Sequence, residues 1–167
     1  MTPCIPMHPP ALAEGHAHMS EQAVKVLVFS HRPEVRADII TAVGNRPAAD
    51  LPRLSFFETG KIADVLYAAD RGEIDLAILD GEAQPTGGMG LSRQLKNEIT
   101  DCPPVVVAVR RKDDRWLATW SLADAVIVHP LDPLTSAETV AEVLRAQRGH
   151  GRALESGADA PLPVVHG

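Results

Sequence analysis

The sequence predicts a single doubly wound α/β domain, in which five parallel strands form one sheet and helices cover both of its faces. Short apolar runs of strand length alternate with amphipathic helical segments along the middle of the chain. The strand runs are mostly apolar throughout, as expected for strands that are buried on both faces of a parallel sheet. At 167 residues with 45% hydrophobic content, the chain can bury one good core and is most simply one domain.

The first half of the domain is expected to contain two strands and two helices. VKVLVF (Val24–Phe29) is an apolar run of strand length, and PEVRADIITAV (Pro33–Val43) carries its apolar residues on one helical stripe. LSFFE (Leu54–Glu58) is a second, weaker strand. We expect Thr59 to cap the helix that follows and Gly72 to end it.

The second half is expected to contain three strands and three helices. A capping box formed by Thr135 and Glu138 predicts the start of the last helix, which we expect to run through Gln147. The remaining elements are predicted at Asp75–Leu79 for the third strand, from Leu91 for the third helix, at Pro103–Val109 for the fourth strand, from Asp113 or Asp114 to Leu122 for the fourth helix, and at Ala125–Val128 for the fifth strand.

The two ends of the chain differ from the middle. Residues 1–23 and 149–167 show no periodicity, and we expect both to be disordered tails around a domain at 24–148. His8, His16 and His18 lie in the first tail, where no packed scaffold would fix a metal site. Met19 is an alternative start to Met1. Neither tail is expected to hold an output domain, so we predict a stand-alone module.

Composition excludes several classes of protein. The formal net charge of −6 leaves no broad basic field for nucleic acid. Cys4 and Cys102 are too few for a disulfide framework, which favours a reducing, cytoplasmic location. No apolar stretch approaches the roughly 20 residues of a membrane span, so we expect no direct membrane insertion.

Polar residues follow several of the predicted strands. Ser30 and His31 follow the first strand, Asp80 follows the third, and His129 follows the fifth. The carboxyl ends of the strands are where open α/β sheets carry ligands and reacting groups. We therefore expect any functional site to lie at this edge, with Asp80 at its centre.

Three more specific interpretations of this edge have little support in the sequence. His31, Asp80 and His129 have the composition of a two-His-one-carboxylate metal site, but nothing in the sequence fixes the geometry. Ser30, His31 and Asp80 are disfavoured as a hydrolase triad, because adjacent strand residues point to opposite faces and no nucleophile elbow is present. The glycines in Gly87–Gly90 lack the spacing and the Lys of a phosphate-binding loop.

From Val24 to about Arg148, the chain resembles the receiver domain of two-component response regulators. The resemblance rests on Asp80 with its Pro- and Gly-containing loop, on the Pro before the fourth strand, and on His129-Pro130 where receivers have Lys-Pro. It implies a flavodoxin-like sheet with strand order 2-1-3-4-5. It also implies that Asp80 stands where receivers accept a phosphoryl group from a histidine kinase.

The other functional positions of the family are degenerate. Ser30 and His31 replace the acidic pair that holds Mg²⁺, Val109 replaces the switch Ser or Thr, Val126 replaces the aromatic switch residue, and His129 replaces the Lys that pairs with phosphate. A hydroxyl and an imidazole hold Mg²⁺ poorly, and Val109 cannot donate a hydrogen bond to a phosphoryl group. A His with a pKa near 6.5 supplies the positive charge only in part.

We therefore expect a pseudo-receiver that needs no cofactor and has no enzymatic activity. In this interpretation Asp80 pairs with His129 or another neighbour and holds the strand ends together. The alternative is a phosphorylation-competent single-domain regulator, which would use Asp80, Mg²⁺ and a histidine kinase.

Trp116 and Trp120 are candidates for partner binding. They are four residues apart in a predicted helix, so they share a face, and Trp is enriched at binding hot spots. Arg111 and its basic neighbours could orient an acidic partner. The chain is similar to orphan response regulators of mycobacteria and related actinobacteria. That resemblance implies respiratory complex I, the NADH:quinone oxidoreductase, as a partner at the cytoplasmic face of the membrane.

Overall fold

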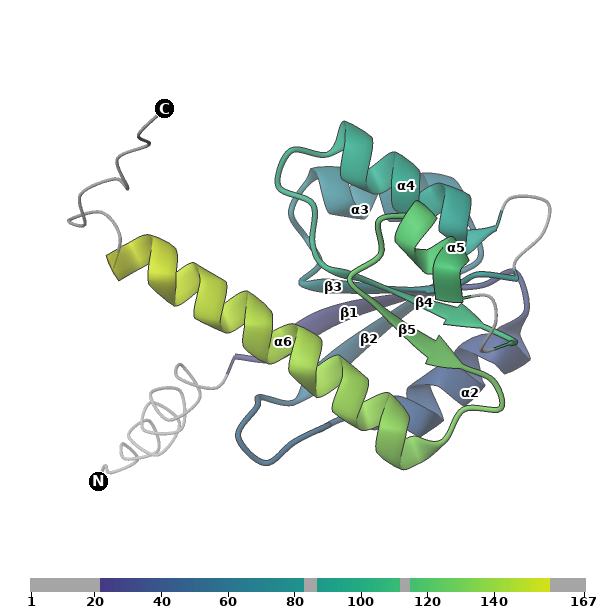
Figure 1. Cartoon of the computed structure of the whole chain (residues 1–167), viewed down its shortest axis with the longest axis horizontal. Helices are drawn as coiled ribbons and strands as arrows, with labels where there is room; N and C mark the ends of the chain where they lie inside the picture. Colours follow the sequence, from purple (N-terminus) through teal and green to yellow (C-terminus); the bar gives the residue numbers. More distant parts are fainter. Residues whose placement is uncertain (1–21, 83–86, 112–114, 157–167) are drawn as a thin grey trace, which may run out of the picture.

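The chain forms a three-layer α/β domain in the computed structural model (Figure 1), which describes residues 22–82, 87–111 and 115–156. Five parallel strands form one sheet in the order β2-β1-β3-β4-β5, which confirms the predicted fold class and strand order. The strands are β1 (Val24–Phe29), β2 (Leu54–Thr59), β3 (Leu76–Asp80), β4 (Val105–Val109) and β5 (Ala125–Val128). The helices are α2 (Pro33–Val43), α3 (Ile62–Asp70), α4 (Gly88–Glu98), α5 (Arg115–Trp120) and α6 (Pro133–Ser156).

Helices α2 and α6 cover one face of the sheet, and α3, α4 and α5 cover the other (Figure 1). Each face has its own apolar cluster because side chains along a strand alternate between the two sides. In β4, Val106 and Ala108 pack with the α2 and α6 side, whereas Val105, Val107 and Val109 pack with the α3 and α4 side. Burial of each such Val side chain contributes on the order of 1.5–3 kcal/mol. The inner strands are therefore mostly apolar.

The predicted cap at Thr59 is wrong, because Thr59 is the last residue of β2. Its hydroxyl donates to Asp64 Oδ2 at 2.7 Å and accepts the Lys61 amide at 3.0 Å, so it supports the turn that leads into α3. Strand pairing with β1 extends to this residue and removes it from the helix. Gly72 has a φ of +68° just after α3, as expected for a helix stop.

The predicted start of the last helix is also wrong. Helix α6 begins at Pro133, and Asp132 Oδ2 accepts the Thr135 amide at 2.8 Å, so Asp132 is the cap. Pro at the first helical position loses no hydrogen bond there. The helix also continues to Ser156, beyond the predicted end at Gln147.

Two other helix bounds differ from the prediction. Helix α4 begins at Gly88, one turn before Leu91, and α5 ends at Trp120. Leu122 lies beyond α5 with a φ of +65°. The predicted caps at Asp113 and Asp114, and the histidines of the first tail, lie outside the described residues. None of the helices that the structure describes is long and apolar enough to cross a membrane.

Helix α6 packs beside α2 and then continues past the sheet (Figure 1). Val140, Ala141 and Leu144 are buried against the sheet, whereas residues 145–149 are exposed. Arg145 makes a two-pronged ion pair with Asp50, with its Nε and Nη2 at 3.0 and 2.7 Å from the two carboxylate oxygens. This pair ties α6 to the loop between α2 and β2.

We predict that the pKa of Asp50 depends on its ion pair with Arg145. Hydrogen bonds from Arg145 lower the pKa of the Asp50 carboxyl from 3.8 to about 2. Because the folded pKa lies below the unfolded value, the stabilisation is complete above about pH 4 and is lost as the pH falls towards 2. An NMR titration of the Asp50 carboxyl carbon measures the pKa, which should return to about 3.9 in Arg145→Gln. The same pKa in both proteins would contradict the ion pair.

Candidate functional site

Asp80 lies at the carboxyl end of β3 and is completely buried. Its Oδ2 accepts the Ser30 hydroxyl at 2.8 Å, and its Oδ1 accepts the Glu82 amide at 2.9 Å. Arg32 Nη2 lies 3.5 Å from Oδ2 and completes an ion pair. A buried carboxylate is costly unless it is paired and hydrogen-bonded, and Asp80 has both kinds of partner.

Ser30 links Asp80 to the start of α2. While its hydroxyl donates to Asp80, the same oxygen accepts the Arg32 amide at 3.1 Å. Arg36 Nη1 donates to the Ser30 carbonyl at 2.6 Å and its Nε pairs with Glu58 at 3.2 Å. The ends of β1, β2 and β3 are therefore joined through one continuous polar network.

The start of α4 packs directly on the backbone of Asp80. A Cβ on Gly88 would lie 2.5 Å from the Asp80 carbonyl oxygen and 2.9 Å from the Leu79 Cβ. A Cβ on Gly81 would lie 2.7 Å from the Ala108 carbonyl oxygen, on β4. Both contacts are shorter than side chains allow, so the glycines of this loop serve close packing at the strand ends.

Asp80 was expected to pair with His129 or with another neighbour, and it pairs with other neighbours, Ser30 and Arg32. His129 donates its backbone amide to Val109, at 2.8 Å, and within the described chain its ring makes no hydrogen bond or ion pair with Asp80. Because β4 lies between β3 and β5, and His129 is two residues beyond the position level with Asp80, their backbones are more than about 10 Å apart, at roughly 4.8 Å per strand. An imidazole is shorter than a Lys side chain, whereas Arg32 reaches Asp80 from the turn between the neighbouring strand β1 and α2.

The other degenerate positions are apolar or point elsewhere. Val109 is buried, and Val126 packs half-buried against the same cluster on the α3 and α4 side. His31 donates from Nδ1 to the Gly60 carbonyl at 2.8 Å and packs edge-on against Phe29, with ring centres 5.3 Å apart. Its ring is thus engaged on the β2 side of the site.

These contacts exclude the sharper interpretations. Among the residues that the structure describes, no group of three or more His, Cys, Asp or Glu could hold a metal ion, so His31, Asp80 and His129 do not form a metal site. Ser30 bonds directly to Asp80 with no imidazole between them, so the hydrolase triad is wrong. The site also does not fit Mg²⁺, because the oxygen that would bind it accepts a hydroxyl and faces a guanidinium.

Arg32 is the residue that the sequence analysis missed. It directly follows the two positions where the acidic pair of receivers is replaced, and a cation two residues after a buried Ser was the available signal. Its side chain remains 42% exposed. Together with Arg110 and His129, it lines a hollow of about 470 Å³ between α2 and the ends of β4 and β5.

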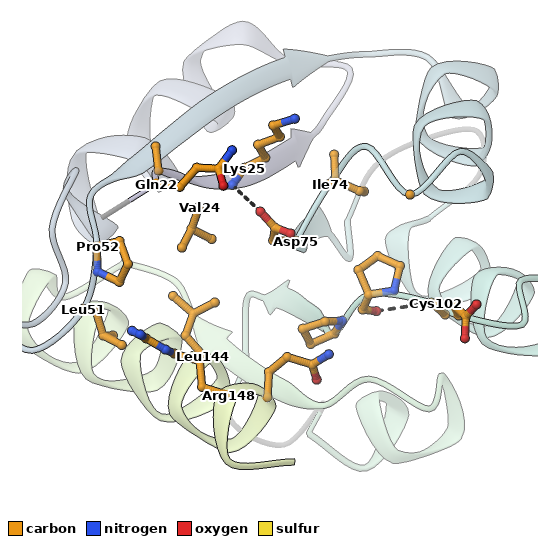
Figure 2. Close-up of a pocket in the computed structure, with 16 residues that line it drawn as sticks. Gln22, Val24, Lys25, Leu51, Pro52, Ile74, Asp75, Cys102, Leu144 and Arg148 are labelled. Carbon is orange, nitrogen blue, oxygen red and sulfur yellow. Dashed lines mark hydrogen bonds between the residues drawn. The ribbon is translucent and has the colours of Figure 1, made fainter. Parts of the chain in front are cut away.

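A larger hollow, of about 580 Å³, lies at the opposite edge of the sheet (Figure 2). Its lining includes apolar residues such as Leu51 and Leu144 and charged residues such as Lys25, Asp75 and Arg148. All of its lining belongs to the amino ends of the strands, to the adjoining loops and to α6. It contains none of the residues that contact Asp80.

The two tryptophans of α5 are exposed, Trp116 by 66% and Trp120 by 50%. The Arg93 guanidinium lies 4.9 Å from the centre of the Trp120 ring, and its Nη1 donates to the Trp120 carbonyl at 2.6 Å. Trp120 is therefore held in place while half of it faces solvent. Arg110 and Arg111 are exposed at the end of β4.

Comparisons with known proteins identify relatives of the chain. A response regulatory protein of Mycobacterium tuberculosis strain H37Rv, itself uncharacterised, is 48% identical over 127 residues, which cover 76% of this chain and 96% of the relative. The protein from strain CDC 1551 matches equally well. No protein-family model matches.

Solved structures share the fold at low sequence identity. A chemotaxis response regulator of Vibrio cholerae is 15% identical, with a TM-score of 0.59, over 73% of this chain and 99% of that one. The receiver domain of a response regulator from Geobacillus stearothermophilus is 19% identical, with a TM-score of 0.60, over 78% of this chain and 99% of that one.

We predict that Gly88→Ala lowers the free energy of unfolding by about 1–3 kcal/mol, because its Cβ would displace α4 from Asp80. Gly90→Ala is the matched control. It lies in the same helix with nothing within 4 Å, and it should raise the free energy of unfolding by about 0.5–1 kcal/mol. Urea denaturation measures both values. Similar values for the two variants would show that the close approach at Gly88 is unimportant.

Proposed function

The chain belongs to the response regulator family, with one receiver domain, and we propose that this receiver is a protein-binding module that works without phosphoryl transfer or any other catalysis. The observation that supports the proposal is the state of Asp80. Its carboxylate is fully buried and is engaged by Ser30, Glu82 and Arg32. Phosphoryl transfer requires an acceptor oxygen that is open to the incoming group and a cation that neutralises its charge.

Neither the transfer step nor its readout is supported by the surrounding residues. For transfer, Asp80 Oδ2 would have to give up the Ser30 hydroxyl and attack past the Arg32 guanidinium. For readout, Val109 has no donor for a phosphoryl oxygen, and it is buried in the core. Positive charge beside Asp80 comes permanently from the Arg32 guanidinium, so no change in charge marks an active state. In this proposal the domain therefore keeps one conformation for its partner.

The exposed tryptophans support the binding role. Trp116 and Trp120 offer two large side chains on one short helix, and Arg93 reduces the freedom that Trp120 would lose on binding. Arg110 and Arg111 at the end of β4 favour a partner with acidic groups beside an apolar patch.

We propose respiratory complex I as the partner. This rests on the resemblance to orphan regulators of actinobacteria, and the mycobacterial relatives agree with it in source. The protein would then reach the cytoplasmic face of the membrane through this complex.

We predict that incubation with Mg²⁺ and acetyl phosphate leaves the intact mass unchanged, because the acceptor oxygen is occupied. A receiver that is known to accept phosphate from acetyl phosphate, in the same reaction, is the positive control. The competing function is a phosphorylation-competent regulator, which the position of Asp80 at the end of β3 favours. A prompt adduct that disappears in Asp80→Asn would establish that alternative.

We predict that Trp116→Ala and Trp120→Ala each reduce recovery of complex I with the tagged protein from a mycobacterial host. Truncation of a hot-spot residue costs about 2 kcal/mol or more, so the dissociation constant should rise roughly thirtyfold. Tyr67→Ala is the matched control, since Tyr67 is an aromatic residue of α3 that is 62% exposed. Recovery of the protein without complex I, or equal recovery with all three variants, would count against this surface.

A further inference from the structure

Strand β2 offers free hydrogen-bonding groups at the edge of the sheet. In the described sheet it pairs with β1 alone. The amides of Val24 and Ser30 donate to the carbonyls of Arg53 and Thr59, so the odd-numbered residues of this segment direct their backbone groups towards β1. Backbone groups alternate in direction along a strand, so Phe56 and Glu58 direct theirs away from the sheet. Such an edge is a template for another strand.

An apolar hollow lies directly beside this edge. It has a volume of about 400 Å³ and lies between β2 and α3. Leu27, Phe57, Ala68 and Ile74 provide its apolar lining. The Phe57 side chain is 51% exposed. A partner side chain next to Phe57 would cover this surface.

The two ends of the hollow carry opposite charges. Lys25 lies at the end level with Ser55, and its amino group has no hydrogen-bonding or ionic partner in the described chain. Asp64 lies at the other end, where it accepts the Thr59 hydroxyl at 2.7 Å and pairs with no cation among the described residues. The remaining two carboxylates of the lining already pair with arginines. Lys25 and Asp64 are thus the charges left for a partner.

We propose that the free edge of β2 binds an extended segment of a partner protein as a sixth strand, with an acidic, an apolar and a basic residue at alternate positions. Ser55, Phe57 and Thr59 mark the three levels, which span about 13 Å at roughly 3.3 Å per residue. Side chains two residues apart share a face, so a parallel segment reads acidic-x-apolar-x-basic. An antiparallel segment has the reverse order.

This surface is separate from the tryptophans, which lie on α5 beside the opposite edge strand, and it includes none of the residues that contact Asp80 directly. Main-chain hydrogen bonds supply affinity in strand addition, and pockets for alternate side chains supply specificity. The apolar residue would lie beside Phe57, the basic residue would face Asp64, and the acidic residue would face Lys25. The domain then has two docking edges, so it can bridge two proteins or two parts of one complex.

Labelled synthetic peptides test the proposal. The probes carry the cores Glu-Thr-Val-Thr-Lys and Lys-Thr-Val-Thr-Glu, which cover both strand directions. The control core Glu-Val-Thr-Thr-Lys has the same composition but places Val on the other face. We expect one probe to shift the NMR signals of the Phe56 and Glu58 amides, and to bind at least fivefold more tightly than the control by fluorescence anisotropy.

Variants of the edge locate the binding. Glu58→Pro removes an amide that faces away from β1, so it should abolish probe binding while the pairing with β1 remains. Asp64→Lys should weaken binding of the probe and favour a version that has Glu in place of its Lys. This reversal keeps the test decisive even if Glu58→Pro does not fold. Trp120→Ala should bind the probe as the wild type does.

Three outcomes would overturn the proposal. The first is unchanged Phe56 and Glu58 signals at millimolar peptide, and the second is equal binding of the control peptide. The third is a concentration-dependent dimer by light scattering that Glu58→Pro abolishes, because the occupant of the edge would then be a second copy of this chain.

Discussion

The compensation of one buried carboxylate determines how the carboxyl edge of this domain is built. Asp80 is inside the protein, so its charge requires partners that do not leave. Ser30 and Arg32 provide them from the turn after β1, and Arg36 extends the network to β2. The same groups that stabilise the carboxylate also occupy its Oδ2 oxygen.

The fold could be predicted well because each buried strand corresponds to a short apolar run in the sequence. Apolar runs located β1 and β5 to the residue, since strands of a parallel sheet covered by helices are mostly apolar. Helix starts were less predictable, because several residue types can cap. Thr59 pairs with β1 as the last residue of β2 and therefore does not cap α3. Asp132, which precedes the pattern formed by Thr135 and Glu138, caps α6 instead. The ionic partner of Asp80 was not predicted for a different reason, because spacing along the chain does not give distance across the sheet. His129 follows β5, two strands away from β3, whereas Arg32 lies in the turn after the adjacent strand β1.

Apolar surface on this domain is divided between its two sides. Trp116 and Trp120 are exposed beside β5, and Phe57 is exposed on β2, while the three inner strands are covered on both faces. A receiver that changes conformation needs a core that can rearrange. Here the polar network and the close contact at Gly88 join the ends of the strands. Under the proposals above, the sheet would act as a spacer between two binding surfaces.

The pair between Arg145 and Asp50 has a consequence for how the protein is made. The two residues are 95 positions apart, and α6 completes the apolar cluster that β1 and α2 begin. During synthesis, the α2 face of the sheet therefore stays uncovered until α6 leaves the ribosome, and contacts of such long sequence separation form slowly. A chain without α6 would leave the part of this cluster that Val140, Ala141 and Leu144 complete exposed to solvent and to chaperones. Folding of this face of the sheet therefore depends on the last helix.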